Sequence, residues 1–236
     1  MLSKYHQPLT HLDQKFDAHG HVLRFPGNTL LCHVPLFTPL SDALTAVRDR
    51  IGAAPHADAL ATLPPESYHM TVFEGANDLA RTRERWPAAL PLNATMAQCT
   101  RHMDGKLRAF DLGCELPLRM KLDEPGQQLM IGAMRLVPAD AAEAHKLRGL
   151  RDRLAQHLGM RTPWHDSYAF HITHSYLIKL LSLDAVKQAL AVHSQLYSEL
   201  VAPLGVIALG APEFCTFNDM LAFDNRFLLR RQEHGA

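Results

Sequence analysis

The sequence lacks the long apolar segment that a membrane-spanning helix needs. No run of about 18 apolar residues occurs in its 236 residues, and the N-terminal stretch has no apolar region typical of a signal peptide. It also lacks a charge excess, because 24 Lys and Arg residues balance 24 Asp and Glu residues. Proteins that coat nucleic acid normally carry a basic excess, so any polyanion should bind in a local pocket. We predict a cytoplasmic protein without membrane or DNA partners, and we expect a monomer.

Cysteine is scarce, and its spacing does not suit a site built from paired thiols. The four cysteines include no C-x-x-C pair, which is the usual element of cysteine zinc and redox motifs. Free thiols in a reducing compartment are therefore expected. The sequence also has no glycine-rich phosphate loop, no G-x-S-x-G elbow and no Rossmann fingerprint. We predict no cofactor.

Histidine is the residue in excess, with 15 copies scattered along the chain. The rest of the composition is that of an ordinary globular protein, with 47% hydrophobic and 20% charged residues. Most single histidines in such a chain are exposed or hydrogen-bonded in the core. The pair His19-x-His21 would bind a metal only with a third ligand, and no carboxylate–histidine set with zinc spacing accompanies it. We predict no metal site.

The predicted elements occur in much the same order twice. The hydrophobic patterns, caps and turns give two sets of elements. The first set has strands at 29–35 and 67–73, a helix beginning at Ser41 or Asp42, a short helix at 78–90 and a hairpin at 95–112 that turns at Asp104-Gly105. The second set has strands at 116–122, 128–137 and 168–178, helices at 139–158 and 183–201, and closing strands at 206–209, 213–217 and 220–229.

No linker rich in Ser and Gly separates the two sets. We therefore predict one α+β domain over residues 1–236. It has two similar lobes, at about 25–115 and 116–230, which can exchange their terminal strands.

One short motif occurs once in each half. His69-Met70-Thr71 and His171-Ile172-Thr173 each follow a proline break and an aromatic residue, and the two histidines are 102 residues apart. Residues i and i+2 of a strand point to the same face, so the histidine and threonine of each motif project together. If a pseudo-twofold relates the halves, two imidazoles and two hydroxyls converge in one groove.

Such a set of side chains suits phosphodiester chemistry. Hydroxyl and imidazole N–H groups donate hydrogen bonds to phosphate oxygens. Cleavage needs a base for the attacking water and an acid for the leaving oxygen, and histidine titrates close enough to neutrality to serve as either. This arrangement requires no metal.

The two His-x-Thr motifs resemble the signature of the two-histidine (2H) phosphoesterase superfamily. That superfamily includes RNA 2′,3′-cyclic phosphodiesterases, also called 2′-5′ RNA ligases. The upstream stretch Phe25-Pro26-Gly27-Asn28-Thr29 resembles a little-characterised bacterial and fungal branch. The resemblance extends over about residues 15–230. It implies a bilobal pseudo-twofold fold in which two antiparallel sheets line a central cleft and the helices lie outside.

The resemblance also implies a function and roles for four residues. His69 and His171 would be acid and base, in an order the sequence leaves open, and Thr71 and Thr173 would hold phosphate oxygens. The implied reaction is metal-independent cleavage of a cyclic phosphodiester, or of a 2′-5′ or 3′-5′ linkage. The substrate would be an RNA end or a small nucleotide.

Two departures from the family pattern are visible. The spacing of 102 between the motifs is longer than usual, so the region 95–112 is a candidate insertion that reshapes the cleft. His174 occupies a position where similar proteins commonly carry an apolar residue. It faces away from His171, so we interpret it as a structural, hydrogen-bonded residue.

Other residues near the motifs allow two interpretations each. Tyr168 is our candidate for stacking a base, a contact worth about 1–3 kcal/mol, and the neighbouring aromatic residues suit a core. The arginines in Arg81-x-Arg83-x-Arg85 indicate a solvated helix face or its end. Asn28-Thr29 is either a ligand loop or a turn.

Two other functions stay open. The first is a catalytically silent RNA- or nucleotide-binding protein with the same fold. In such a protein, replacement of either motif histidine would change binding, and there would be no turnover to lose. The second is a histidine-rich metalloprotein, which metal analysis of untagged protein would reveal.

Overall fold

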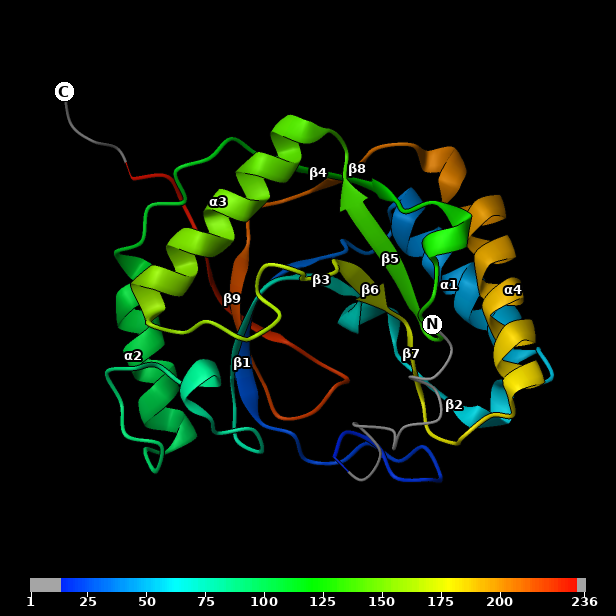
Figure 1. Cartoon of the computed structure of the whole chain (residues 1–236), viewed down its shortest axis with the longest axis horizontal. Coiled ribbons are helices and arrows are strands. Elements are labelled where there is room, and N and C mark those ends of the chain that lie inside the picture. The colour runs from blue at the N-terminus through cyan, green and yellow to red at the C-terminus, as the bar shows by residue number, and fades with distance from the viewer. Residues whose placement is uncertain (1–13, 233–236) are drawn as a thin grey trace.

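The computed structural model describes residues 14–232, which form a strongly curled antiparallel sheet with helices outside (Figure 1). The order of the eight strands is β10-β9-β1-β3-β6-β5-β4-β8. These strands are β1 (Gly27–His33), β3 (His69–Asn77), β4 (Leu118–Leu122), β5 (Ala133–Pro138), β6 (His171–Thr173), β8 (Ile207–Leu209), β9 (Glu213–Phe217) and β10 (Asp224–Leu228). A second sheet pairs β2 (Leu60–Thr62) with β7 (Ser175–Leu177). The predicted α+β fold is confirmed.

A pseudo-twofold relates the two halves of the large sheet about the junction of β3 and β6. Cys32 of β1 pairs with Met70 of β3, and Met134 of β5 pairs with Ile172 of β6. Cys32 and Met134 are 102 residues apart in the sequence, and so are Met70 and Ile172. The two motifs have the same spacing. The C-terminal strands β9 and β10 return to the edge of β1. The lobe boundaries at 25–115 and 116–230 stay a prediction.

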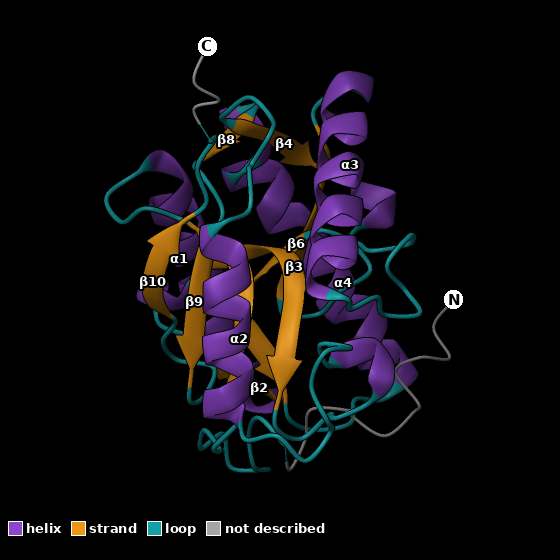
Figure 2. Ribbon diagram, turned by 90° about the vertical axis from the view of Figure 1, so that its left-hand side faces the viewer, coloured by secondary structure: helices purple, strands orange, loops and turns teal. Residues whose placement is uncertain are grey.

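The described residues form four α-helices, which lie outside the sheet. They are α1 (Pro39–Gly52), α2 (Met96–Arg108), α3 (Ala141–Leu158) and α4 (Leu183–Leu200). Figures 1 and 2 show α2 and α3 on one side of the molecule and α1 packed against α4 on the other. Helix α3 begins at its N-cap Asp140 and ends before Gly159, which has a φ of +65°. No helix among the described residues is long and apolar enough to cross a membrane.

Residues 96–108 form a helix within the region 95–112, so the hairpin predicted there is wrong. Helix α2 begins with a capping box formed by Thr95 and Gln98, and it buries Cys99, Met103 and Leu107. The spacing of four residues between these side chains gives an apolar stripe along one face of the helix. The dipeptide Asp104-Gly105 lies within this helix and forms no turn. Helix α2 packs on β1, β3 and β9, and none of its residues lines the cleft described below.

Two other helix predictions need correction. Residues 78–90 form no α-helix, only a 3₁₀ turn at Arg83–Arg85 within a loop. Helix α1 begins earlier than predicted, because Thr38 is its N-cap and Ser41 is the third residue of the capping box. In both places proline decides the geometry: Pro39 starts α1, whereas Pro87 and Pro91 break the second segment.

The predicted strand at 168–178 is divided between the two sheets. Residues 171–173 join the large sheet as β6, and residues 175–177 join the small sheet as β7. The chain bends at His174, where Gly132 approaches closely: its carbonyl accepts hydrogen bonds from the amides of His174 and Ser175. The strand β6 therefore ends with the second motif at Thr173, whereas β3 continues beyond the first motif to Asn77.

Candidate active site

The two motifs meet side by side at the centre of the large sheet. Met70 pairs with Ile172 in antiparallel register, which places His69 opposite Thr173 and Thr71 opposite His171. The pairing residues Met70 and Ile172 are buried, whereas the four motif side chains face the other side. Opposite side chains on adjacent strands lie about 4.5–5.5 Å apart at Cβ. Each histidine therefore has the threonine of the other motif as its neighbour.

Both histidines are held in the same way. His69 Nδ1 lies 2.6 Å from the carbonyl oxygen of Ser67, and His171 Nδ1 lies 2.8 Å from that of Ala169. A carbonyl oxygen only accepts hydrogen bonds, so Nδ1 carries the proton in each ring and Nε2 is left to exchange one.

The environment keeps both rings neutral. Burial lowers the pKa of His69 to about 4, and the charges of His33, His171 and Lys15 act in the same direction. Burial also lowers the pKa of His171, with Lys15 adding to the effect. Glu74 and the hydrogen bond to Ala169 oppose the shift at His171. Each Nε2 is therefore available as a proton acceptor in the free protein.

The four motif side chains line a cavity of about 500 Å³, a size typical of a small-molecule site. Its walls carry mixed chemistry, with two cations, one carboxylate and several aromatic rings. These further lining residues include Lys15, Glu74, Arg85, Phe25, Tyr168, Tyr176, Phe217 and Phe223. Asn28 and Thr29 also line it, so this dipeptide belongs to the wall of the cavity.

Lys15 is a cation of the cavity that the sequence analysis did not identify. Its Nζ donates to the Tyr176 hydroxyl at 3.3 Å and lies 4.8 Å from the centre of the Tyr176 ring and 5.2 Å from that of Phe25. It forms no ion pair with a carboxylate of the described residues. The ammonium group is thus held by aromatic rings, with its charge available to the cavity.

Tyr168 lies beside the second motif, as its sequence position suggested. Its ring centre is 6.3 Å from that of His171, and its hydroxyl interacts with the side chain of Thr71. The Arg151 guanidinium lies 4.1 Å from the centre of the Tyr168 ring. Burial raises the pKa of Tyr168, so the hydroxyl keeps its proton as a donor.

Arg85, which the sequence analysis placed on a solvated helix face or at its end, is the last residue of the 3₁₀ turn and lines the cavity. Its guanidinium lies 5.1 Å from the centre of the Trp164 ring. Arg83 of the same turn is exposed and donates to the carbonyl of Leu90, so it points elsewhere.

His174 is structural, as predicted. It is fully buried, with Nε2 2.7 Å from the Tyr197 hydroxyl and Nδ1 3.1 Å from the Ser175 hydroxyl. It does not line the cavity.

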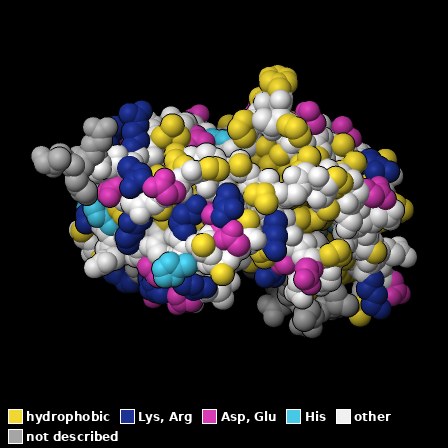
Figure 3. Space-filling model, turned by 90° about the horizontal axis from the view of Figure 1, so that it is seen from above, with side chains coloured by type: hydrophobic (Ala, Val, Ile, Leu, Met, Phe, Trp, Pro, Cys, Tyr) yellow, Lys and Arg dark blue, Asp and Glu magenta, His cyan; other side chains and the backbone are white. Residues whose placement is uncertain are grey.

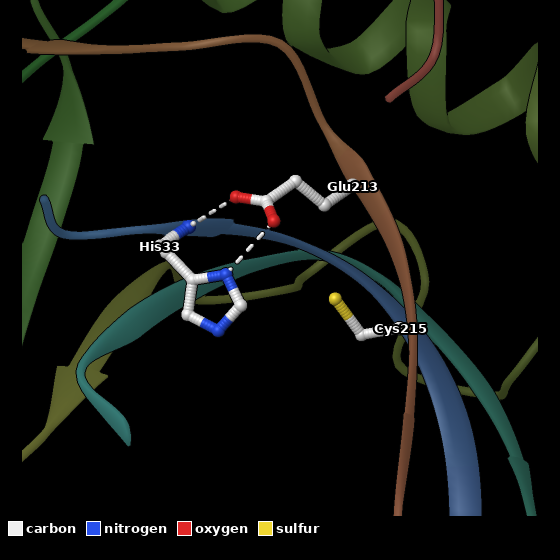
Figure 4. A group of neighbouring side chains, drawn as sticks. All are labelled: His33, Glu213 and Cys215. Atoms are coloured by element: carbon white, nitrogen blue, oxygen red, sulfur yellow. Dashed lines mark hydrogen bonds and ion pairs between the residues drawn. The ribbon is translucent and has the colours of Figure 1, made fainter. Parts of the chain in front are cut away.

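Two groups of side chains among the described residues have the composition of a metal site. His33, Glu213 and Cys215 lie beside the first motif (Figure 4). Glu213 already accepts hydrogen bonds from the amide and ring of His33, at 3.2 and 2.9 Å, and from Asn225 at 2.6 Å. The second group is Asp152, His165 and Asp166, where Arg161 bridges both carboxylates. Hydrogen bonds and ion pairs therefore satisfy the carboxylates in each group.

The earlier candidate His19-x-His21 belongs to neither group. Its His21 ring pairs instead with Asp17, at 2.9 Å, on the surface.

Comparison with known proteins gives a family relationship. Residues 15–131 match the family model 2H-phosphodiest, described as a domain of unknown function (DUF1868). No match was found among curated proteins. Among solved structures, the chain is similar to the conserved protein of unknown function ATU0111 from Agrobacterium tumefaciens str. C58. The two are 31% identical over 94% of each chain, with a TM-score of 0.87. The model's name relates the matched residues to the 2H phosphoesterases, while the bacterial and fungal branch stays a prediction.

Proposed function

We propose that this chain, which belongs to the same family as the Agrobacterium protein ATU0111, is a metal-independent phosphodiesterase. Its substrate is a cyclic phosphodiester, or a 2′-5′ or 3′-5′ linkage, of an RNA end or a small nucleotide. The observation that carries the proposal is the register of the two motifs. Two neutral imidazoles with free Nε2 atoms and two hydroxyls share one face of a cavity.

Each group of the cavity has a role in this reaction. Thr71 and Thr173 donate hydrogen bonds to the non-bridging oxygens, and Lys15 balances the phosphate charge. An anionic phosphate beside the histidines raises their pKa values, so one ring can hold a proton in the complex. One histidine then accepts a proton from water while the other donates one to the leaving oxygen. Each such proton transfer contributes roughly 10²–10⁴-fold in rate.

The shape and charge of the molecule favour a short substrate. The cavity holds about 500 Å³ and contains two cations, Lys15 and Arg85. On the face seen in Figure 3, basic and acidic side chains are interspersed and form no continuous basic field. Long nucleic acids gain much of their affinity from counterion release along such fields. In a salt titration, the logarithm of the binding constant should therefore fall only slowly with the logarithm of the salt concentration. The slope should correspond to about one or two phosphate contacts.

Turnover of defined substrates in EDTA tests the proposal. The panel comprises 2′,3′-cyclic nucleotides, ADP-ribose 1″,2″-cyclic phosphate and oligoribonucleotides with cyclic phosphate ends. We expect at least one to be cleaved, and His69→Gln and His171→Gln each to lose at least 100-fold in rate. The exposed His145 of α3 provides a matched control, and His145→Gln should keep the wild-type rate.

Two results would contradict the proposal. Near wild-type rates in the single histidine variants would exclude the two-histidine mechanism. Binding of the panel without turnover would instead indicate a catalytically silent nucleotide-binding protein. The cytoplasmic location, the monomeric state and the absence of a cofactor stay predictions.

A further inference from the structure

We infer that Glu74 divides the roles between the two histidines, by holding the proton on His171 as general acid and leaving His69 as general base. The inference rests on the proposed phosphodiesterase function. It extends that function by assigning each histidine one role and by adding a positioning residue outside the two motifs.

The backbone of β3 delivers the Glu74 carboxylate to the cavity. Strict alternation after Thr71 would direct Phe73 to the cleft. The register between β1 and β3 instead shifts by one residue at Val72, so β3 contains a bulge. Phe73 is consequently buried, and Glu74 lines the cavity. Bulges beside active sites commonly re-aim a side chain in this way.

A hydrogen bond from Trp164 fixes the orientation of this carboxylate. Trp164 Nε1 donates to Glu74 Oε2 at 2.5 Å. Trp164 belongs to the loop that precedes the second motif, and the Arg85 guanidinium lies 5.1 Å from the centre of its ring. The Trp164 side chain is 38% exposed. The indole N–H is the only side-chain hydrogen-bond donor of this tryptophan, and it bonds to a carboxylate of the cavity. The contact therefore holds Glu74 in position.

The surroundings of the two histidines differ in the position of one carboxylate. Glu74 is the one carboxylate among the described residues that line the cavity. The residue 102 positions later in the sequence is Tyr176 of β7, which lies in the second sheet and whose hydroxyl accepts a hydrogen bond from Lys15 Nζ. One half of the cleft therefore presents an anion where the other presents a phenol and a cation.

The neighbours of His69 do not favour a cation. The Phe223 ring lies 4.2 Å from the His69 ring and the His33 ring lies 6.4 Å away, centre to centre. The nearby carboxylate of Glu213 is bonded to His33 rather than to His69. Burial lowers the pKa of both histidines, that of His69 to about 4, and a backbone hydrogen bond opposes the shift in each. At His171 the Lys15 charge adds to the lowering of the pKa and the Glu74 charge opposes it.

Among residues 14–232, no other ionisable group around His171 supplies a negative charge. Arg135 of β5 lies opposite His171 and is paired with Asp123, at 2.8 Å. The remaining groups near His171 are cationic or neutral, and they are Lys15, His69, Arg151 and Tyr168. An imidazolium at His171 therefore depends on Glu74 and on the bound phosphate.

The proton transfers balance over one turnover. The oxygen of water forms a bond to phosphorus while the bond from phosphorus to the leaving oxygen breaks. His69 Nε2 takes the proton that water loses, and His171 Nε2 gives its proton to the leaving oxygen. Solvent then removes one proton from His69 and restores one to His171.

Histidine titration by NMR tests the link between Glu74 and His171 without requiring turnover. The Cε1–H resonances are followed from pH 4 to 9 in the wild-type protein, Glu74→Gln and Glu66→Gln, and are assigned with His69→Gln and His171→Gln. Glu66 is an exposed carboxylate on the turn before His69 and serves as the control. We expect Glu74→Gln to lower the pKa of His171 by about 0.5–1, as removal of a nearby charge in a wet cleft should do. Trp164→Phe should act in the same direction with a smaller effect.

The pH–rate profile and the leaving group test the assignment of roles. In Glu74→Gln the high-pH limb of kcat/KM should move to lower pH, because that limb reports the acid. His171→Gln should lose far less activity on a nucleoside p-nitrophenyl phosphodiester than on an alkyl diester, since nitrophenolate leaves unprotonated. His69→Gln should lose activity equally on both.

The outcomes separate the inference from the proposed function. An unchanged pKa of His171 in Glu74→Gln, or a larger change at His69, overturns the inference. Rescue of His69→Gln rather than His171→Gln by the activated leaving group does so too. If the wild-type protein cleaves no phosphodiester, the proposed function fails, and the titration still decides whether Glu74 holds the proton on His171.

Discussion

Acidification from pH 7.5 to 5.0 should destabilise the fold, because two histidines are buried in neutral form. His174 and His193 are both 0% exposed, with their rings stacked 5.7 Å apart. His174 shares a hydrogen bond with the Tyr197 hydroxyl, and His193 Nδ1 donates to the carbonyl of Ala189 at 2.7 Å. Burial lowers the pKa of His174 to about 3 and that of His193 to about 4.

The size of the effect follows from proton linkage. The unfolded chain binds protons at these histidines below pH about 6.5, whereas the folded chain excludes them down to their lowered pKa values. The contribution of these two histidines to the free energy of unfolding is therefore complete above pH about 6.5 and falls as the pH drops toward 4. A pH of 5.0 lies about 1.5 below the ordinary histidine pKa of about 6.5. Each histidine then lowers the free energy of unfolding by about 1.5 × 1.36, or about 2 kcal/mol. The pair costs about 4 kcal/mol, a large part of the roughly 5–15 kcal/mol of a typical domain.

Urea unfolding at pH 7.5 and 5.0 measures this loss directly. The comparison uses wild-type protein, His193→Leu and the exposed control His145→Gln. The wild type should lose at least about 4 kcal/mol between the two pH values, and the control should match it. His193→Leu should lose about 2 kcal/mol less, whatever its stability at pH 7.5. If His193→Leu and the wild type lose the same amount, the buried histidines do not cause the acid sensitivity.

Two further predictions test the corrected helix and the phosphate clamp. Gly105→Ala should stabilise the fold by about 0.5–1 kcal/mol, because a Cβ in α2 would meet no atom within 4 Å. Gly132→Ala should destabilise it by more than about 1 kcal/mol, because φ is +83° and the Cβ would lie 2.3 Å from the Ser175 carbonyl oxygen. Thermal unfolding checks both, and destabilisation by Gly105→Ala would favour a turn at that position. Thr71→Val and Thr173→Val should each lower kcat/KM by about 10- to 150-fold, equivalent to ~1.5–3 kcal/mol for one charge-assisted hydrogen bond, and rates within twofold of wild type would exclude the clamp.

Repetition made the central part of the site predictable. The His-x-Thr motifs report directly on strand geometry, because a period of two puts each histidine and threonine on one face. The 102-residue offset then implied that the two strands are equivalent. The observed pairing of Met70 with Ile172 agrees with that expectation. Strand and helix order was also predictable wherever one apolar period dominated, as in α3.

The errors came from places where two local patterns compete. Asp104-Gly105 is a strong hairpin dipeptide, and it outweighed the stripe of Cys99, Met103 and Leu107 that defines α2. The capping box at Thr95 and Gln98 was the pattern that could have decided the question. Residues 78–90 are polar enough for a surface helix, yet Pro87, the following Pro91 and side chain-to-carbonyl hydrogen bonds give an irregular loop.

Lys15 could not have been found from local sequence. It reaches the cavity only because its segment folds against Tyr176, 161 residues away along the chain. The position of Arg85 depends in the same way on Trp164, which belongs to the other half. Long-range contacts of this kind leave no periodic pattern in the sequence.

Glu74 raises a more general point about duplicated active sites. A pseudo-twofold supplies two equivalent histidines, but hydrolysis needs one proton donor and one proton acceptor. Strict continuation of the two-residue period of the first motif would place Phe73 in the cleft, so the motif alone does not reveal the bulge at Val72 that brings in Glu74. In the second half the chain leaves the large sheet after Thr173, and Tyr176 of the second sheet accepts a hydrogen bond from Lys15. The difference between acid and base therefore arises where the two halves diverge, in residues outside the repeated motif that act through it.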